Sequence, residues 1–216
     1  MFFTNIPLNE TFEIAVDLIL RYNPNLNITK NELSKLFHFT TSSTNFLFNG
    51  NMYEQIDGVA MGSPLAPILA NLFMGYHERN WINNYSASGP SYYRRYVDDI
   101  FALFENESDA ERFFKYLNEQ HPNIKFTLEK QNDGKIPFLD VLIENDDDKF
   151  FTSVYHKPTH TGLLTNYFSF IPNSYKISLI RTLVDRTFKI NNTWNYFDKD
   201  LTKLSATFCK NMFHLS

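Results

Sequence analysis

A tight turn of two acids between two β-rich runs constrains the fold of this chain more than any other feature. Residues 92–97 and 100–104 are rich in aromatic and β-branched side chains, and Asp98 and Asp99 join them directly. Runs joined this closely pair antiparallel as a hairpin, whereas parallel strands need a long crossover. The sequence therefore predicts antiparallel sheet in the middle of the chain.

A second hairpin is predicted upstream of the first. Residues 45–48 and 51–53 flank Asn49-Gly50, a dipeptide that suits the left-handed positions of a two-residue turn. Three further strands are predicted over residues 125–130, 136–144 and 149–155.

Amphipathic helices alternate with these strands. Residues 9–22 place apolar side chains at helical spacing, and Ser63-Pro64 starts the longest predicted helix. Its apolar stripe consists of Leu65, Ile68, Leu69, Leu72, Phe73 and Tyr76. Further helices are predicted after Thr29 and Ser108, and two more over residues 173–213, divided near Asn191. The predicted fold class is α+β, an antiparallel sheet backed by helices with a C-terminal helical segment.

Composition limits the class of protein. The 216 residues are 43% hydrophobic, which suits one sizeable core, and 17% aromatic, which excludes a disordered or collagen-like chain. The longest apolar stretches are too short to cross a bilayer, and no secretory signal precedes the first helix. A single cysteine, Cys209, allows no internal disulfide. We expect a nuclear or cytoplasmic protein that is neither secreted nor membrane-bound.

A formal net charge of −4 counts against a strong basic field for collecting phosphates. An enzyme can still hold its basic residues in one groove, or on another part of the protein.

The Asp98-Asp99 pair allows two interpretations. Asp is common in turns, so a solvated turn explains the tetrapeptide 96–99 about as well as a functional site does. The functional interpretation is a hard-cation site, in which the carboxylates hold magnesium and substrate phosphates supply other ligands.

Small residues lead into the predicted helix at Ser63. Gly58, Ala60 and Gly62 would let the backbone approach a ligand closely, and free amides at a helix start favour anionic groups. For the glycines alone, a loop that merely enters a helix is the better explanation.

Taken together, in this order and at this separation, the glycine loop with its helix and the acidic hairpin resemble the palm of a reverse transcriptase. Their amino-acid sequences are most similar to those of the Penelope-like retroelement group. The resemblance covers nearly the whole chain, through residues 3–8, 55–74, 96–99, 121–127, 138–141 and 155–161.

The resemblance implies RNA-directed DNA polymerisation, in which a primer 3′-hydroxyl attacks a deoxynucleotide with two magnesium ions at the reacting oxygens. It makes Asp98 the main metal ligand of the hairpin and Asp99 a weaker ligand or supporting partner. Other residues would contact the substrate. These are Phe3, which would select deoxynucleotides, Met61, Gly62 and Ser63, which would lie against the incoming nucleotide and template base, and Tyr96. Many reverse transcriptases carry Gln in place of Met61, so no hydrogen bond is assumed there.

The resemblance also implies a domain layout and partners. Residues 1–160 would form the palm, truncated at its N-terminus, and residues 161–216 would begin the thumb. Phe138, Leu139 and Asp140 would grip the primer end, where a plain sheet segment is an equal alternative. The expected cofactor is Mg²⁺, with Mn²⁺ possible, and the expected partners are an RNA template, a DNA primer and deoxynucleotides.

One metal ligand of the family is not in this sequence. The first motif begins with an Asp, and the match through residues 3–7 places it just upstream of Met1. Glu10 and Asp17 are poor substitutes for this Asp, because the helix after Pro7 carries them away from the end of the strand. We therefore predict that the chain as written is not a competent polymerase.

Several alternatives stay open. The chain would be a non-catalytic remnant that binds nucleic acid or a protein, a decayed fragment, or a cellular relative resembling telomerase. Phe3 argues against an RNA polymerase.

His156 and His160 have the spacing of a zinc pair, but Pro158 between them breaks a helix. Four basic residues of the 173–190 region would reach phosphates or form a solvated face: Lys176, Arg181, Arg186 and Lys189.

Overall fold

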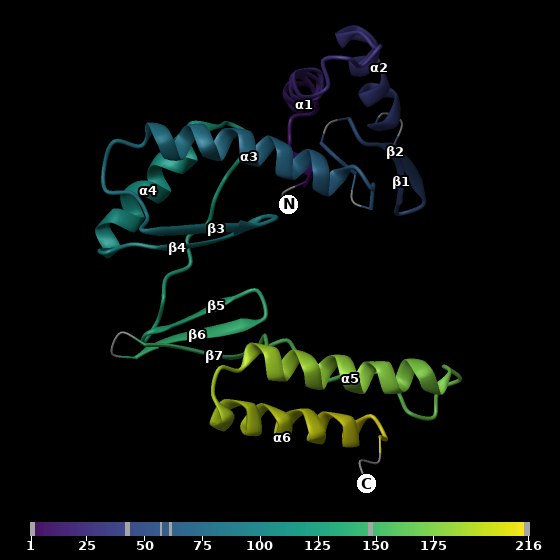
Figure 1. Ribbon diagram of the computed structural model, residues 1–216. Helices are drawn as coiled ribbons and strands as arrows, with labels where there is room; N and C mark the ends of the chain where they lie inside the picture. Colours follow the sequence, from purple (N-terminus) through teal and green to yellow (C-terminus); the bar gives the residue numbers. More distant parts are fainter. Residues whose placement is uncertain (1–2, 42–43, 57, 61, 147–148, 214–216) are drawn as a thin grey trace. The chain divides into compact units, whose positions relative to one another are not determined.

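The computed structural model describes residues 3–41, 44–56, 58–60, 62–146 and 149–213 (Figure 1). Contacts divide the chain into two compact units, Met1–Leu128 and Glu129–Ser216, and we describe each by itself. Helices and antiparallel strands occur in both units, which confirms the predicted α+β class. The helices are η1 (Phe3–Asn5), α1 (Leu8–Tyr22), α2 (Lys30–Thr41), α3 (Ala66–Asn84), α4 (Glu107–Gln120), α5 (Asn173–Ile190) and α6 (Trp194–Lys210).

The described strands form three separate antiparallel sheets. The first unit holds two hairpins, β1 (Asn45–Phe48) with β2 (Asn51–Glu54), and β3 (Tyr92–Tyr96) with β4 (Asp99–Leu103). The second unit holds a three-stranded sheet of β5 (Lys135–Phe138), β6 (Val141–Asp146) and β7 (Lys149–Val154), in that order.

Helix α3 organises the core of the first unit. One buried cluster joins Ile6, Phe73 and Trp81 to Phe113 of α4, and partly buried Tyr93 packs against it. A second cluster joins the N-terminal half of α3 to α1 through Leu69 and Phe12. Because α3 serves both clusters, every element that contacts it is fixed relative to it.

The face that α3 buries differs from the predicted stripe. Ile68 and Tyr76 are 61% and 48% exposed, whereas Ala70, Met74 and Trp81 are buried. The helix also begins at Ala66 rather than at Ser63-Pro64, since residues 63–65 form a turn in which Ala66 N–H donates to the Ser63 carbonyl at 3.1 Å. The predicted stripe is therefore confirmed at Leu69 and Phe73, but it left out the small residues Ala66 and Ala70, which are also buried in the core clusters.

Two predicted strands are also corrected. Residues 125–130 adopt no strand, and residues 136–144 are divided into β5 and β6 by a turn at Leu139 and Asp140. Leu139 has a positive φ of 56°, which reverses the chain direction there.

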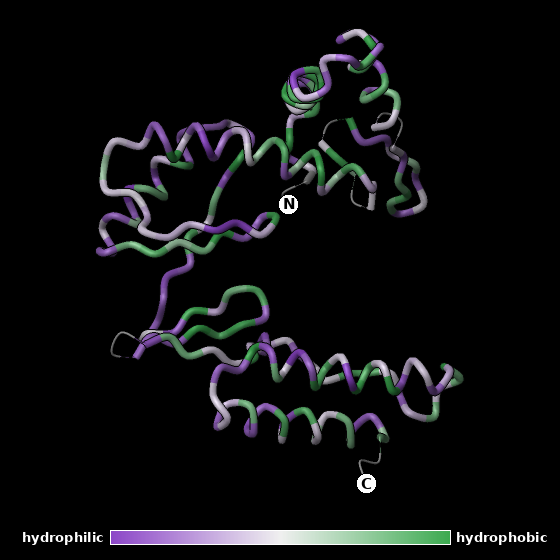
Figure 2. The backbone as a smooth tube through the Cα atoms, viewed as in Figure 1, coloured by the Kyte–Doolittle hydropathy of each residue, from purple (hydrophilic) through white to green (hydrophobic). Residues whose placement is uncertain are grey.

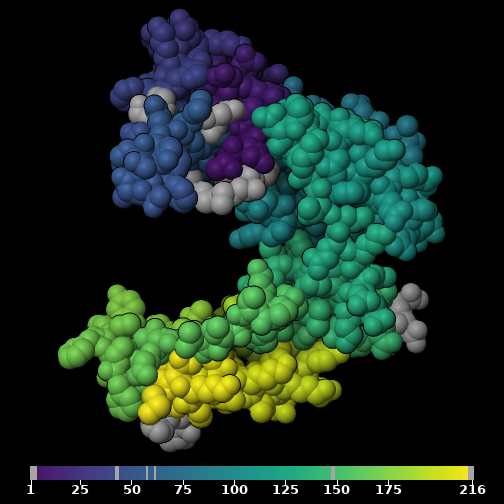
Figure 3. All heavy atoms as spheres, turned by 180° about the vertical axis from the view of Figure 1, so that it is seen from behind, coloured from purple at the N-terminus to yellow at the C-terminus, as the bar shows by residue number. Residues whose placement is uncertain are grey.

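In the second unit, α5 and α6 pack side by side and both contact β7 (Figure 3). The carboxylate of Asp200 accepts the Val154 amide N–H at 3.0 Å, which ties α6 to the sheet. The Thr152 hydroxyl of β7 donates to the Ile190 carbonyl at 2.6 Å, and this hydrogen bond ties α5 to the sheet. None of the described helices is long and apolar enough to cross a membrane.

Candidate active site

The acidic pair lies at the tip of the β3–β4 hairpin. Tyr96 pairs with Asp99, so the two-residue turn consists of Val97 and Asp98, one residue earlier than predicted. Both carboxylates are exposed, and within the described part of the chain neither has a hydrogen bond or ion pair. Figure 2 shows β3 as largely hydrophilic and β4 as largely hydrophobic, so the turn joins a polar strand to an apolar one.

A buried polar cluster anchors this hairpin to α3. The Glu78 carboxylate accepts the Tyr93 hydroxyl at 2.6 Å and the Arg95 Nε–H at 2.8 Å. Burial, together with the hydrogen bond to Glu78, raises the pKa of Tyr93 far above its usual range. Arg95 also donates Nη1–H to Asn71 at 2.8 Å and to the Val97 carbonyl at 2.9 Å.

This cluster was not predicted from the sequence. The available signal was Glu78, which lies four residues after Met74 and three before Trp81, on the buried face of α3. An acid at such a position needs a partner, because an unpaired buried charge is costly. Arg95 in the following strand is the complementary residue.

The loop before α3 contains two glycines with different roles. Gly58 is buried with a φ of +79°, and a Cβ there would collide with the Thr4 carbonyl. Gly62 is exposed with a φ of +91°, and a Cβ there would meet no atom of the described residues within 4 Å. Only Gly62 therefore leaves open space for a ligand, whereas Gly58 serves packing within the protein.

Of the other residues predicted to contact the substrate, the structure describes the side chains of Tyr96 and Ser63. Tyr96 is 62% exposed beside the turn, and the Ser63 Oγ accepts the Leu65 amide N–H at 3.3 Å. Phe3 belongs to η1, but its side chain lies outside the described part of the structure, as does Met61 entirely.

Helix α3 brings the three predicted site segments onto one scaffold. The η1 segment contacts α3, and the adjoining Ile6 lies in the same cluster as Ala70 and Phe73. The Gly62 loop leads directly into the helix, and the hairpin attaches through Glu78. The structure therefore attaches residues as far apart in the sequence as Thr4 and Asp99, a separation of 95 positions, to a single helix.

The predicted primer-grip residues form the turn between β5 and β6 in the second unit. Phe138 ends β5 and pairs with Val141, and Leu139 is 39% exposed. The Asp140 carboxylate pairs with Arg186 of α5 at 2.7 Å. This surface ion pair links the turn to α5.

The basic residues predicted to face phosphates are mostly engaged within the protein. Lys176 is buried, donates to the Ser169 carbonyl at 3.0 Å and lies over the Tyr167 ring. Lys189 pairs with Asp185 of its own helix, and Arg186 pairs with Asp140. Arg181 alone of the four has no such partner among the described residues.

The acidic pair suits a hard divalent cation. Mg²⁺ is usually bound through one or two carboxylates plus substrate phosphates and water, and the free oxygens of Asp98 and Asp99 offer that donor set. In the described ranges no three acidic, histidine or cysteine side chains gather as a metal cage. The His156 and His160 rings lie 5.0 Å apart without a third ligand group among those residues.

Glu10 and Asp17, the nearby acids considered as substitutes, have other partners. Glu10 lies 2.9 Å from His77 Nε2 and 3.1 Å from His121 Nε2, and Asp17 pairs with Lys30 at 2.7 Å.

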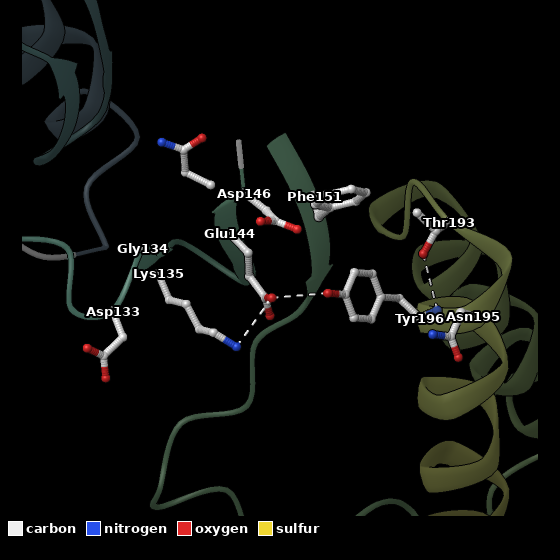
Figure 4. A pocket seen from close by; sticks show the side chains of 10 residues that line it. Asp133, Gly134, Lys135, Glu144, Asp146, Phe151, Thr193, Asn195 and Tyr196 are labelled. Atoms are coloured by element: carbon white, nitrogen blue, oxygen red, sulfur yellow. Dashed lines mark hydrogen bonds and ion pairs between the residues drawn. The ribbon is translucent and has the colours of Figure 1, made fainter. Parts of the chain in front are cut away.

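A pocket of about 440 Å³ lies between the β-sheet and α6 of the second unit (Figure 4). Glu144 accepts the Tyr196 hydroxyl at 3.0 Å and pairs with Lys135 at 3.3 Å across it. This hydrogen bond raises the pKa of Tyr196. None of the residues predicted for the site lines the pocket, and its polar groups tie the sheet to α6.

Comparisons with known proteins agree with the site geometry. Residues 163–216, which include α5 and α6, match the model of the animal helix-turn-helix domain. No curated protein and no solved structure matches the chain. Residues 2–139, which include η1, α3 and the β3–β4 hairpin, match the model of the reverse transcriptase (RNA-dependent DNA polymerase) family. Because this match covers more than half of the 216 residues, the chain belongs to the reverse transcriptase family.

Proposed function

We propose that the chain is part of an RNA-directed DNA polymerase from a Penelope-like retroelement, with a palm over residues 1–160 and the start of a thumb over residues 161–216. The observation that carries the proposal is the exposed carboxylate pair, without a partner among the described residues, on a turn fixed to α3 within the part that matches the family. The assignment to the Penelope-like group rests on the amino-acid sequences of the motifs, above all residues 61–64 and 155–161.

In this proposal Asp98 is the main ligand of a divalent cation, and Asp99 a weaker ligand or a supporting partner. Mg²⁺, or Mn²⁺ in its place, would stabilise the attacking and leaving oxygens of nucleotide transfer. Gly62 gives the incoming nucleotide and template base room to approach the backbone, and Ser63 and Met61 flank it. Phe3 excludes a ribose 2′-hydroxyl, and Phe138 to Asp140 contact the primer end.

The 216-residue polypeptide by itself is proposed to be inactive. The resemblance would put the family's first-motif Asp upstream of Met1, and the acids nearest to that position in the sequence, Glu10 and Asp17, are engaged with His77, His121 and Lys30. Without that Asp, a polypeptide of these 216 residues would be severely impaired in transfer that uses two metal ions.

Primer extension on an RNA template, with deoxynucleotides and Mg²⁺, tests both statements. We expect no extension by the purified polypeptide or by its Asp98→Ala/Asp99→Ala variant. Extension by the parent but not by the variant would support polymerase chemistry at this pair and contradict the proposed inactivity. Extension by both the parent and the variant would contradict the assignment of Asp98 and Asp99 as metal ligands.

A second candidate function is non-catalytic binding of nucleic acid or of a protein. The match of residues 163–216 to an animal helix-turn-helix domain favours it, and competes with the proposal that residues 161–216 begin a thumb. Binding of an RNA–DNA heteroduplex that weakens steeply with salt, without extension, would support nucleic-acid binding. The location, nuclear or cytoplasmic, stays a proposal from composition.

A further inference from the structure

Arg95 joins the catalytic turn to helix α3. Its side chain is only 12% exposed, and Nε–H donates to Glu78 at 2.8 Å. Nη1, which carries two N–H groups, donates to the Asn71 Oδ1 at 2.8 Å and to the Val97 carbonyl at 2.9 Å. One guanidinium therefore contacts two side chains of the helix and the backbone of the turn.

The Glu78 carboxylate holds this guanidinium in a fixed orientation. Its other oxygen accepts the Tyr93 hydroxyl at 2.6 Å, so both oxygens have partners. Tyr93 and Arg95 are two residues apart on β3 and share one face of the strand. The strand is therefore fastened to α3 at two consecutive points on that face.

The Val97 carbonyl immediately precedes Asp98 in the chain. Val97 has a φ of 56°, a left-handed conformation that β-branched residues rarely adopt. The hydrogen bond from Arg95 to this carbonyl holds the turn in that conformation. We infer that Arg95 is a positioning residue that fixes the β3–β4 turn on α3 and thereby sets where Asp98 and Asp99 point. The inference rests on the proposed function of these acids.

The role requires the guanidinium rather than a positive charge alone. A planar fork donates to a carboxylate and to a carbonyl at the same time, whereas a lysine ammonium at the end of a flexible stem is a point charge. The neighbouring Arg94 is a matched control. It is exposed, donates to the Tyr93 carbonyl at 2.9 Å and lies over the Tyr92 ring, so its contacts stay within its own strand.

The test uses the whole chain, labelled with ¹⁵N, and Mn²⁺ as the probe. Bound Mn²⁺ broadens the amide resonances of nearby residues, so a titration followed at Asp98 and Asp99 yields a dissociation constant without any polymerase activity. We expect Arg95→Lys to bind Mn²⁺ about 10-fold more weakly, because partners that orient a metal ligand change affinity by about 10–100-fold. Arg94→Lys keeps the parent affinity.

Further variants separate positioning from folding. Resonances of the α3 core show whether each variant is folded, and Asn71→Ala, which removes one exposed partner, replaces Arg95→Lys if that variant unfolds. Asn71→Ala is expected to weaken Mn²⁺ binding and to speed amide hydrogen exchange at Asp98. Unchanged Mn²⁺ affinity in folded Arg95→Lys and Asn71→Ala would overturn the inference.

The Asp98→Ala/Asp99→Ala variant distinguishes failure of the inference from failure of the proposed function. If it loses Mn²⁺ binding while Arg95→Lys binds like the parent, the metal site stands and the role of Arg95 is wrong. If it binds Mn²⁺ like the parent, the proposed metal site is wrong, and the role of Arg95 falls with it.

Discussion

A Cβ atom on Gly58 would collide with the carbonyl oxygen of Thr4. The backbone of the loop before α3 therefore packs directly on η1, and the φ of +79° at Gly58 adds a second reason for glycine. This contact joins η1 to the loop before α3 through the protein's own backbone.

We expect Gly58→Ala to lower the free energy of unfolding by about 2–4 kcal/mol, the sum of a left-handed backbone and an overpacked contact. Gly50 is the matched control, because its φ is +78° but a Cβ there meets no atom within 4 Å in the part of the chain that the structure describes. Gly50→Ala should therefore cost about 1 kcal/mol. Urea unfolding of both variants checks this, and equal losses would show that the Thr4 contact is unimportant.

Signals that depend on neighbouring residues predicted the structure well. Asn49 and Gly50 both have positive φ, as the predicted turn requires. Thr29 starts α2 through a capping box, since the Glu32 carboxylate accepts the Thr29 amide N–H at 2.8 Å and the Thr29 hydroxyl oxygen accepts the Glu32 amide N–H at 3.3 Å. Such features form within a few residues and need no distant partner.

Features that depend on distant partners were predicted poorly. Residues 125–130 have the side chains of a strand, but no strand forms there because β-propensity reflects packing and pairing more than intrinsic preference. For the same reason the sequence indicated Asp98 and Asp99 but not Arg95, whose role depends on Glu78, 17 residues earlier on another element.

Glu78 is expected to be the most sensitive polar residue of the first unit. Glu78→Ala leaves the buried Arg95 without its ion pair, so we expect a loss of about 3–5 kcal/mol in the free energy of unfolding. Tyr93→Phe removes one hydrogen bond and should cost about 1–2 kcal/mol. Denaturant unfolding measures both. Glu119→Ala, a change at an exposed position of α4, should stay within about 0.5 kcal/mol of the parent.

Asp140 allows a functional role to be separated from a structural one. Its ion pair with Arg186 has side chains that are 65% and 41% exposed, and exposed pairs contribute less than about 1 kcal/mol. A double-mutant cycle of Asp140→Ala and Arg186→Ala, followed by thermal unfolding, should give a coupling energy below that value. A larger coupling would mean that the pair holds the β5–β6 turn in place, and effects of Asp140 on primer binding would then be indirect.

His77 makes the stability of the first unit depend on pH. Its side chain is 14% exposed and stacks on Trp81, and burial lowers its pKa below the ordinary value. Glu10 faces the ring at 2.9 Å and opposes this shift, whereas nearby His121 adds to it. Since the unfolded chain binds the proton more readily, the stabilisation is present above the unfolded pKa of about 6.5 and is lost as pH falls toward the folded value.

We therefore expect the free energy of unfolding to decrease between pH 7.5 and 5.5, a range about one unit either side of the unfolded pKa. His77→Gln should lower stability at the upper end and flatten the pH dependence, because glutamine does not titrate. Urea unfolding at several pH values compares the two proteins, and a slope that survives in His77→Gln would assign the pH dependence to other groups.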